Sequence, residues 1–192
     1  HPERGIVSPA EFVAAIQENG LVVPIGRRFF ADVCRQLREW RNRFPAAARI
    51  AVNVNFAGQE LIEAGLIDNL IETLDDEGLE PEHFVVEITE STVLANLPQA
   101  GVVLRRIRDA GLRVVLDDFG TGHSALSCLH ELPMNGLKLD RTFIVRESRH
   151  PAILRAIIVL AEQLGLTVTA EGIETVAQFE QQAFSGFFAD AG

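Results

Sequence analysis

The sequence predicts an α/β fold built on a parallel β-sheet, and two observations lead to this prediction. Five short runs of aliphatic and β-branched residues are separated by segments of helical character, which is the pattern of buried parallel strands in βαβ units. Each run also ends in a polar or charged residue, and α/β-barrels carry their functional side chains at the C-terminal ends of their strands. The runs read AVNVN, FVVEITE, RVVLDDFGTG, GLKLD and LTVTAEGIE.

Composition and charge narrow the class of protein. The chain has 192 residues, 47% of them hydrophobic, and a mean hydropathy of +0.15, which fits one domain with a sizeable core. The net charge of −10 argues against a nucleic-acid groove, but it allows an anionic small molecule where metal ions reverse the local sign. Cys34 and Cys128 show no metal-ligand spacing and are interpreted as reduced structural thiols.

Targeting features give further expectations. No apolar run approaches the ~20 residues that span a bilayer, and no signal peptide is recognisable. We therefore expect a cytoplasmic domain with no membrane span. Because the chain opens at His1 rather than Met, we also expect it to be a piece of a longer protein.

Two helices are expected before the first strand. Ser8-Pro9 with Glu11 is an N-terminal capping pattern, and Asn19-Gly20 is a typical helix end, so the first helix lies between them. The second runs from about Ile25 to Phe44, with an apolar stripe on one face and six arginines on the other. We interpret the basic face as a solvated helix surface rather than a binding patch.

From there strands and helices alternate, because each apolar run is followed by a helical segment that glycine or proline closes. Gly78, Gly111 and Gly165 end three of the helices, and Pro133 stops another. The strands are expected at Ile50–Asn53, Phe84–Ile88, Arg113–Asp117, Gly136–Leu139 and Thr167–Ala170. The helices are expected at Gln59–Glu77, Leu97–Ala110, Ser124–Glu131, Ala152–Leu164 and Thr175–Gln182.

The polar residues at the strand ends form a candidate metal site. Carboxylate and amide oxygens without clustered Cys or His suit Mg²⁺ or Mn²⁺ rather than zinc. Two such ions ~3.5–4 Å apart are the usual arrangement for phosphodiester hydrolysis, and an adjacent pair of aspartates could serve both. Lys138 could hold the attacking water or a phosphate oxygen as a point charge. The expected cluster is Asn53, Glu87, Asp117, Asp118 and Glu171.

Several of these residues have an ordinary alternative. Asn53 and Asn55 could cap a loop, and Glu90 could be the acidic first residue of a helix. Asp140 precedes Arg141, so a structural salt bridge there is an alternative to a functional role. The Asp-Phe-Gly sequence at position 118 resembles one kinase motif, but the Gly-rich nucleotide loop and the other kinase motifs are absent, so that reading fails.

Taken as whole motifs, these segments resemble the EAL-domain family of bacterial cyclic di-GMP phosphodiesterases. The resemblance implies a modified TIM (β/α)8 barrel that hydrolyses cyclic di-GMP to linear pGpG with two Mg²⁺ or Mn²⁺ ions. It is carried, in family order over nearly the whole chain, by HPERGIVSPAEF, VNV, EITES, LDDFGTGHSAL, LKLDRTFI and AEGIET.

The resemblance also assigns roles to individual residues. Asn53, Glu87, Asp117 and Asp118 correspond to metal ligands. Lys138 and Glu171 correspond to residues that act on the water and the ions, Glu174 belongs to the surrounding cluster, and Asp140 is expected to bind substrate. Glu90 resembles the glutamate that tethers the loop from Asp118 to His123, next to the dimer interface. The implied partners are cyclic di-GMP, a second copy of the barrel, and sensory or GGDEF-type domains upstream.

The sequence also departs from the family pattern. The name-giving Glu-Ala-Leu lies upstream of the HPERG segment in the family, and the last strand is not recognisable, so residues 1–192 are expected to form an EAL domain incomplete at both ends. Without that glutamate, these residues alone are expected to be inactive. The alternatives are a non-catalytic cyclic di-GMP receptor or protein-interaction module and, with little support beyond fold class, an unrelated metal-dependent lyase or aldolase.

Overall fold

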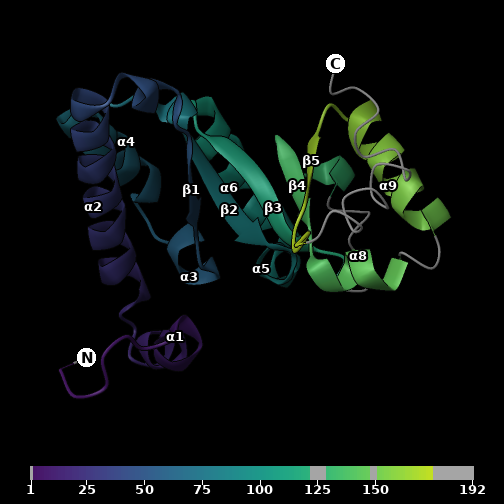
Figure 1. The fold of residues 1–192 in the computed structure, drawn as a ribbon, viewed down its shortest axis with the longest axis horizontal. Helices are drawn as coiled ribbons and strands as arrows, with labels where there is room; N and C mark the ends of the chain where they lie inside the picture. The colour runs from purple at the N-terminus through teal and green to yellow at the C-terminus, as the bar shows by residue number, and fades with distance from the viewer. Residues whose placement is uncertain (1, 122–128, 148–150, 175–192) are drawn as a thin grey trace. The chain divides into compact units, whose positions relative to one another are not determined.

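The structure of the chain, a computed structural model, describes residues 2–121, 129–147 and 151–174 (Figure 1). It divides into two compact units. The first contains residues 1–50 and 56–80, and the second contains residues 51–55 and 81–192.

The first unit is helical. Its longest helix, α2, presents Phe30, Cys34 and Leu37 to a core that α4 completes with Leu70 and Leu74. Cys34 is fully buried, and burial raises the pKa of its thiol to about 12, as expected for a structural rather than a reactive thiol. The elements are α1 (Pro9–Glu18), α2 (Val22–Arg43), the 3₁₀ helix η1 (Pro45–Arg49), α3 (Gly58–Leu61) and α4 (Leu66–Glu77).

The expected helix from Gln59 to Glu77 is wrong as a single element. Gly65 adopts a left-handed conformation with φ of 82°, and this residue separates α3 from α4. A left-handed residue breaks the run of backbone hydrogen bonds, so the chain changes direction between the two helices.

The second unit is built on a five-stranded sheet in which every described pairing is parallel. Each expected strand is present, and the strands lie side by side in chain order, as they do in a (β/α)8 barrel (Figure 1). The α/β fold class is therefore confirmed. The strands are β1 (Val52–Asn55), β2 (Phe84–Thr89), β3 (Arg113–Phe119), β4 (Gly136–Leu139) and β5 (Thr167–Ala170).

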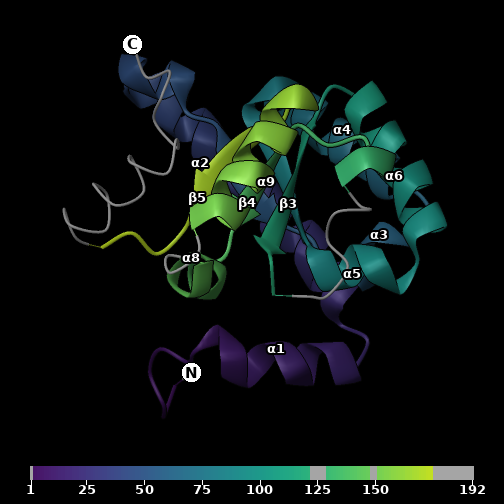
Figure 2. The ribbon, with the colours of Figure 1, turned by 90° about the vertical axis from the view of Figure 1, so that its right-hand side faces the viewer.

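Helices connect the strands of this unit. The helix α6 packs on β3, and α9 packs on β5 in both views (Figures 1 and 2). Two short helices, α5 and α8, follow β2 and β4. The helix α8 was not expected from the sequence, whereas α5 begins at Glu90, as the alternative interpretation of Glu90 as the first residue of a helix predicted. The elements are the 3₁₀ helix η2 (Pro81–His83), α5 (Glu90–Ala95), α6 (Leu97–Asp109), α8 (Arg141–Glu147) and α9 (Pro151–Gln163).

Two expected helices fall on parts of the chain that the structure does not describe. Thr175–Gln182 lies wholly outside the described residues. Ser124–Glu131 lies mostly outside them, although residues 129–131 are helical. His123 and Cys128 are likewise outside.

Candidate metal and phosphodiester site

The polar residues at the strand ends meet in one cluster within the second unit. Parallel strands present their C-terminal ends at one edge of a sheet, so residues far apart in the sequence become neighbours there. Lys138, near the end of β4, has its ammonium nitrogen Nζ within 3.3 Å of carboxylates from β2 and β3 and of Glu171, which directly follows β5.

Lys138 lies at the centre of this cluster. Its Nζ is 2.5 Å from Glu171 Oε1, 3.2 Å from Glu87 Oε1 and 3.3 Å from Asp117 Oδ1. Burial opposes the charge, but hydrogen bonds to Glu171 and Glu87 and the nearby charge of Asp117 outweigh it, so the pKa of Lys138 is raised. The surrounding carboxylates therefore favour the charged ammonium form of Lys138.

Asn53 and Glu87 are joined directly. The Asn53 amide Nδ2 donates to Glu87 Oε1 at 2.5 Å, and the Glu87 side chain is only 4% exposed. This bond orients the carboxylate and leaves the amide oxygen of Asn53 available for another contact. The two residues thus offer a pair of oriented oxygens from β1 and β2.

A β-bulge in β3 gives the cluster its two adjacent aspartates. Leu116 is paired with Leu137 and Phe119 with Leu139, so Asp117 and Asp118 together lie opposite the single residue Lys138. Asp118 has φ of 55°, the one described residue other than glycine with positive φ, and its backbone N–H donates to Asp117 Oδ1 at 3.0 Å. Bulges of this kind re-aim side chains next to active sites.

The electrostatics of Asp118 indicate an excess of negative charge. Burial raises the pKa of its carboxyl group, and the charges of Asp117, Asp140 and Glu171 raise it further against the opposing effect of Lys138. A cation placed among these groups would relieve that repulsion.

The described residues include one group of carboxylates with metal-binding geometry. Asp117, Asp118 and Glu171 each offer an oxygen, and these oxygens all lie within 4.8 Å of one another. The donors are hard oxygens without sulfur or imidazole, which suits Mg²⁺ or Mn²⁺. The cluster therefore fits a divalent metal ion, with Asn53 and Glu87 as nearby oxygen donors.

Glu90 ties the segment after β3 to α5. It is the first residue of α5 and is 1% exposed, and its Oε2 accepts a hydrogen bond from the Gly120 backbone N–H at 3.1 Å. Gly120 has φ of 96°, and a Cβ there would lie 2.4 Å from the Phe143 ring. A buried carboxylate and a ring thus fix the chain immediately after the two aspartates.

Asp140 caps the helix α8. Its Oδ1 accepts hydrogen bonds from the backbone N–H of Thr142, at 2.7 Å, and from the Thr142 hydroxyl. The Thr142 hydroxyl, with further backbone donors, lowers the pKa of Asp140. This capping role was not expected, and the expected substrate contact stays a prediction.

Glu174 forms an ion pair with the first residue of α8. Its Oε1 pairs with Arg141 Nη1 at 2.8 Å, and both side chains are more than half exposed. A salt bridge between Asp140 and Arg141 was one of two alternatives for Asp140, and the structure shows Arg141 paired with Glu174. Arg141 and Glu174 are 33 residues apart in the sequence, so no local sequence pattern predicted that they would pair.

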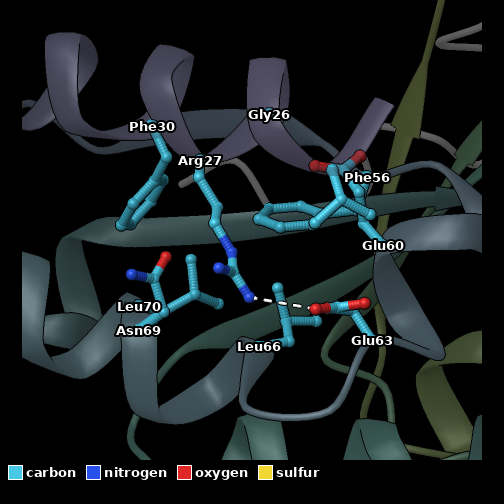
Figure 3. A pocket seen from close by; sticks show the side chains of 10 residues that line it. Gly26, Arg27, Phe30, Phe56, Glu60, Glu63, Leu66, Asn69 and Leu70 are labelled. Carbon is cyan, nitrogen blue, oxygen red and sulfur yellow. Dashed lines mark hydrogen bonds and ion pairs between the residues drawn. The ribbon is translucent and has the colours of Figure 1, made fainter. Parts of the chain in front are cut away.

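A small pocket in the first unit forms a separate feature (Figure 3). Two of its lining residues are joined by an ion pair, in which Arg27 Nη2 donates to Glu63 Oε1 at 3.2 Å. Glu60 is buried beside Gly26, and its Oε2 accepts from the Ala57 backbone N–H at 2.8 Å. The lining is mostly apolar and belongs to the first unit alone: Val23, Gly26, Arg27, Phe30, Phe56, Glu60, Glu63, Leu66, Asn69 and Leu70.

Comparison with known proteins places these motifs in context. The family model described as the EAL domain matches residues 1–185. MucR of Pseudomonas aeruginosa, named a bifunctional diguanylate cyclase/cyclic di-GMP phosphodiesterase, is 38% identical over 183 residues, covering 94% of this chain and 26% of MucR. The cyclic di-GMP phosphodiesterase PdeR of Escherichia coli is 36% identical over 180 residues, covering 92% of this chain and 27% of PdeR.

Solved structures show the same likeness. The c-di-GMP complex of the PaMucR phosphodiesterase matches with a TM-score of 0.85 and 37% identity, over 97% of this chain and 76% of that one. The EAL enzyme Bd1971 with cAMP and cyclic-di-GMP bound matches with a TM-score of 0.87 and 28% identity, over 97% of this chain and 52% of that one. The chain spans about a quarter of the length of the curated relatives described above.

Proposed function

This chain belongs to the EAL domain family, and on that premise we propose that it is a cyclic di-GMP phosphodiesterase domain, which opens one phosphodiester of the nucleotide to give linear pGpG. The observation that carries the proposal is the cluster around Lys138, in which carboxylates from β2, from β3 and from the residue after β5 surround one partly buried ammonium. The relatives named as cyclic di-GMP phosphodiesterases support the substrate class.

We propose that two Mg²⁺ or Mn²⁺ ions bind at this cluster. Glu87, Asp117 and Asp118 would be their carboxylate ligands and Asn53 an amide ligand, because their oxygens line the same edge of the sheet. Divalent ions held there would supply Lewis acidity, which favours attack by water and neutralises charge on the phosphate. The raised pKa of Asp118 supports a site that is stabilised by added positive charge.

Three further residues, Lys138, Glu171 and Glu90, would support the reaction through their charge or by holding other groups in place. Lys138, as an ammonium, would donate to the attacking water or a phosphate oxygen. Glu171 contacts Lys138 at 2.5 Å, so it would orient that ammonium and contribute an oxygen to the ion site. Glu90 would keep the segment after Asp118 in place through its bond to the Gly120 backbone.

The proposal extends to the protein that carries the domain. MucR is named as a bifunctional cyclase and phosphodiesterase, and this chain matches about a quarter of it. We propose that GGDEF-type or sensory domains accompany this domain and that the barrel forms a homodimer. Within the described residues, none of the helices is both long and apolar enough to cross a bilayer.

The test is to follow the conversion of cyclic di-GMP to pGpG by chromatography, using the full-length gene product with Mg²⁺, Mn²⁺ or no divalent ion. Turnover that requires one of these ions, and that disappears in Asp117→Asn while the circular dichroism spectrum is unchanged, is the expected result. An Asp117→Asn variant with the wild-type rate would contradict the assignment of the site.

The same experiment separates the enzyme from a receptor. Tight binding of cyclic di-GMP by the full-length product without any conversion would favour the non-catalytic receptor.

A further inference from the structure

The segment that follows β5 is held at two points, by Leu139 and by Arg141, which lie two positions apart in the chain. The Glu171 backbone N–H donates to the carbonyl oxygen of Leu139, the last residue of β4, at 3.0 Å. Three residues further on, Glu174 pairs with Arg141, the first residue of α8, at 2.8 Å. The short stretch from Leu139 to Arg141 therefore supports the whole segment from Glu171 to Glu174.

Between these two points the Arg141 side chain passes over Gly172. A Cβ at Gly172 would lie 2.7 Å from each of three Arg141 carbons, Cβ, Cγ and Cδ. Such a distance is well inside van der Waals contact, so a side chain at position 172 would displace Arg141. Gly172 also has φ of 71°, which is the left-handed region that glycine tolerates best.

The stretch from Leu139 to Arg141 is itself held in place by hydrogen bonds of Asp140. Asp140 caps α8 through Thr142, and its backbone N–H donates to the Phe119 carbonyl oxygen at 3.3 Å. Phe119 ends β3 directly after the two aspartates of the bulge. Arg141 thus extends from a backbone position that is tied to the strand carrying Asp117 and Asp118.

Glu171 depends on this support for its position. Its side chain is 36% exposed, and it contacts Lys138 at 2.5 Å. A partly exposed carboxylate is less constrained by packing than a buried one, so the backbone that carries it must be fixed by other contacts. A misplacement of about 1 Å can cost roughly 10²-fold in rate.

We propose that Arg141 is a positioning residue, which holds Glu171 in place by covering Gly172 with its aliphatic stem and pairing with Glu174 through its guanidinium group. Arg141 contacts neither the substrate nor the ions in this proposal. Its consequence for turnover rests on the proposed function, and its consequence for ion binding rests on the ion site proposed with that function. Its consequence for the backbone rests on neither.

The first experiment compares Gly172→Ala with Gly165→Ala. Both glycines have φ of 71°, but a Cβ at Gly165 meets nothing within 4 Å, so the pair separates backbone strain from the collision with Arg141. Three readouts apply to the full-length product: hydrogen exchange of the peptide 167–174, Mn²⁺ affinity by electron paramagnetic resonance, and turnover. We expect Gly172→Ala to speed exchange and weaken Mn²⁺ binding by about tenfold, while Gly165→Ala leaves both near wild type.

The second experiment is a double-mutant cycle of Arg141→Met and Glu174→Gln. Methionine keeps most of the stem and removes the charge. For so exposed a pair we expect each single change to weaken Mn²⁺ binding and kcat about threefold, with KM unchanged and no further loss in the double variant. Arg141→Lys should recover most of the loss. Arg35→Met removes a comparably exposed ion pair with Asp32 and should change none of the three readouts.

The outcomes are distinguishable. If Arg141→Met and Gly172→Ala both leave exchange, Mn²⁺ affinity and kcat at wild-type values, the positioning role is wrong. If the wild-type protein shows no turnover at all, the proposed function fails, whereas exchange still decides the role of Arg141. Equal effects of Gly172→Ala and Gly165→Ala would show that backbone strain, and not Arg141, explains the loss.

Discussion

Asp118 combines two features that are unfavourable for folding. It has φ of 55° in a region that most side chains avoid, and its pKa is raised by burial and by three neighbouring carboxylates. Neither feature helps the strand to form. Residues that weaken the fold in this way are commonly kept for function.

We expect Asp118→Asn to stabilise the protein without divalent ions while abolishing turnover. The folded state holds the Asp118 proton more tightly than the unfolded state does. Stability is therefore greatest below the ordinary pKa of 3.8 and falls as the pH rises toward the raised value. Asparagine removes this fall and tolerates the left-handed conformation.

The gain should be roughly 0.5 kcal/mol at pH 7 and should vanish near pH 3. Urea unfolding at several pH values, in the presence of a chelator, measures it. A variant less stable than the wild type at pH 7 would contradict the electrostatic account of Asp118.

Lys138 supplies the positive charge of the cluster when no metal ion is bound. Lys138→Met should lower the free energy of unfolding by about 2 kcal/mol, because it leaves the buried Glu87 carboxylate without its counter-charge. Saturating Mn²⁺ should restore part of the loss, because the ion takes over that role. Urea unfolding with and without Mn²⁺ measures both effects.

The matched control is Arg28→Met, which removes an ion pair with Asp32 in which the Arg28 side chain is 74% exposed. That change should cost less than about 0.5 kcal/mol. Equal losses in the two variants would show that the Lys138 contacts contribute no more than a surface pair.

At this scale the sequence was sufficient for residues in the C-terminal half of a strand or directly after it. Glu87, Asp117, Lys138 and Glu171 could be brought together because parallel strands end at one edge. The contact of Arg141 with Gly172 and Glu174 could not be predicted, because it depends on how the start of α8 meets the chain after β5. The bulge was also missed, since Asp117-Asp118 reads the same in a regular strand.

At the scale of elements, the contact between α3 and α2 contains a buried acidic residue, Glu60. Glu60 lies in α3 against the backbone of α2 at Gly26, where a Cβ would fall 1.9 Å from Glu60 Oε1 (Figure 3). Burial raises the pKa of this carboxyl group, although the bond from the Ala57 N–H opposes the shift. The close approach of α3 to α2 therefore has an electrostatic cost at neutral pH.

Glu60→Gln should stabilise the chain at neutral pH, because it removes a charge that burial disfavours. Glutamine can still accept from Ala57 and carries no charge. For the wild type, the folded state binds the proton more tightly, so stability falls as the pH rises from 4.5 through the raised pKa, and the variant should lack this slope. Thermal unfolding between pH 4 and pH 8 measures this difference in slope, and Glu63→Gln, a change at an exposed carboxyl group, is the control.

The elements that sequence reasoning missed were short or interrupted. The helix α8 has seven residues, too few for a helical period to be recognised. Gly65 was visible within the expected Gln59–Glu77 helix, but a single glycine is tolerated in many helices. Long, periodic elements such as α2, α6 and α9 were predicted to within a few residues.

At the scale of the molecule, the proposed ion site brings together strands that are not adjacent in the sheet. Backbone hydrogen bonds join each strand only to its neighbours. The proposed ligands come from β1, β2 and β3 and from the residue after β5, so an ion bound there contacts distant parts of the same sheet. Such an ion should stabilise the folded state, because the unfolded chain does not hold these oxygens together.

We expect Mn²⁺ at 100 times its dissociation constant to raise the free energy of unfolding by about 2.7 kcal/mol. Asp117→Asn should lose most of this increase, whereas Arg35→Met should keep it. Thermal unfolding across a Mn²⁺ titration measures the effect. A gain of the same size in Asp117→Asn would place the ion elsewhere.

The bulge in β3 also has a consequence for how the sequence can change by deletion. Asp117 and Asp118 face the one residue Lys138, and the pairing is regular on either side, at Leu116 and at Phe119. Loss of the Asp118 codon would therefore restore an uninterrupted ladder and keep Phe119 opposite Leu139. The shortened chain would fold at least as well and would lack an acidic ligand, so a stability screen would favour a deletion that a phosphodiesterase screen would reject.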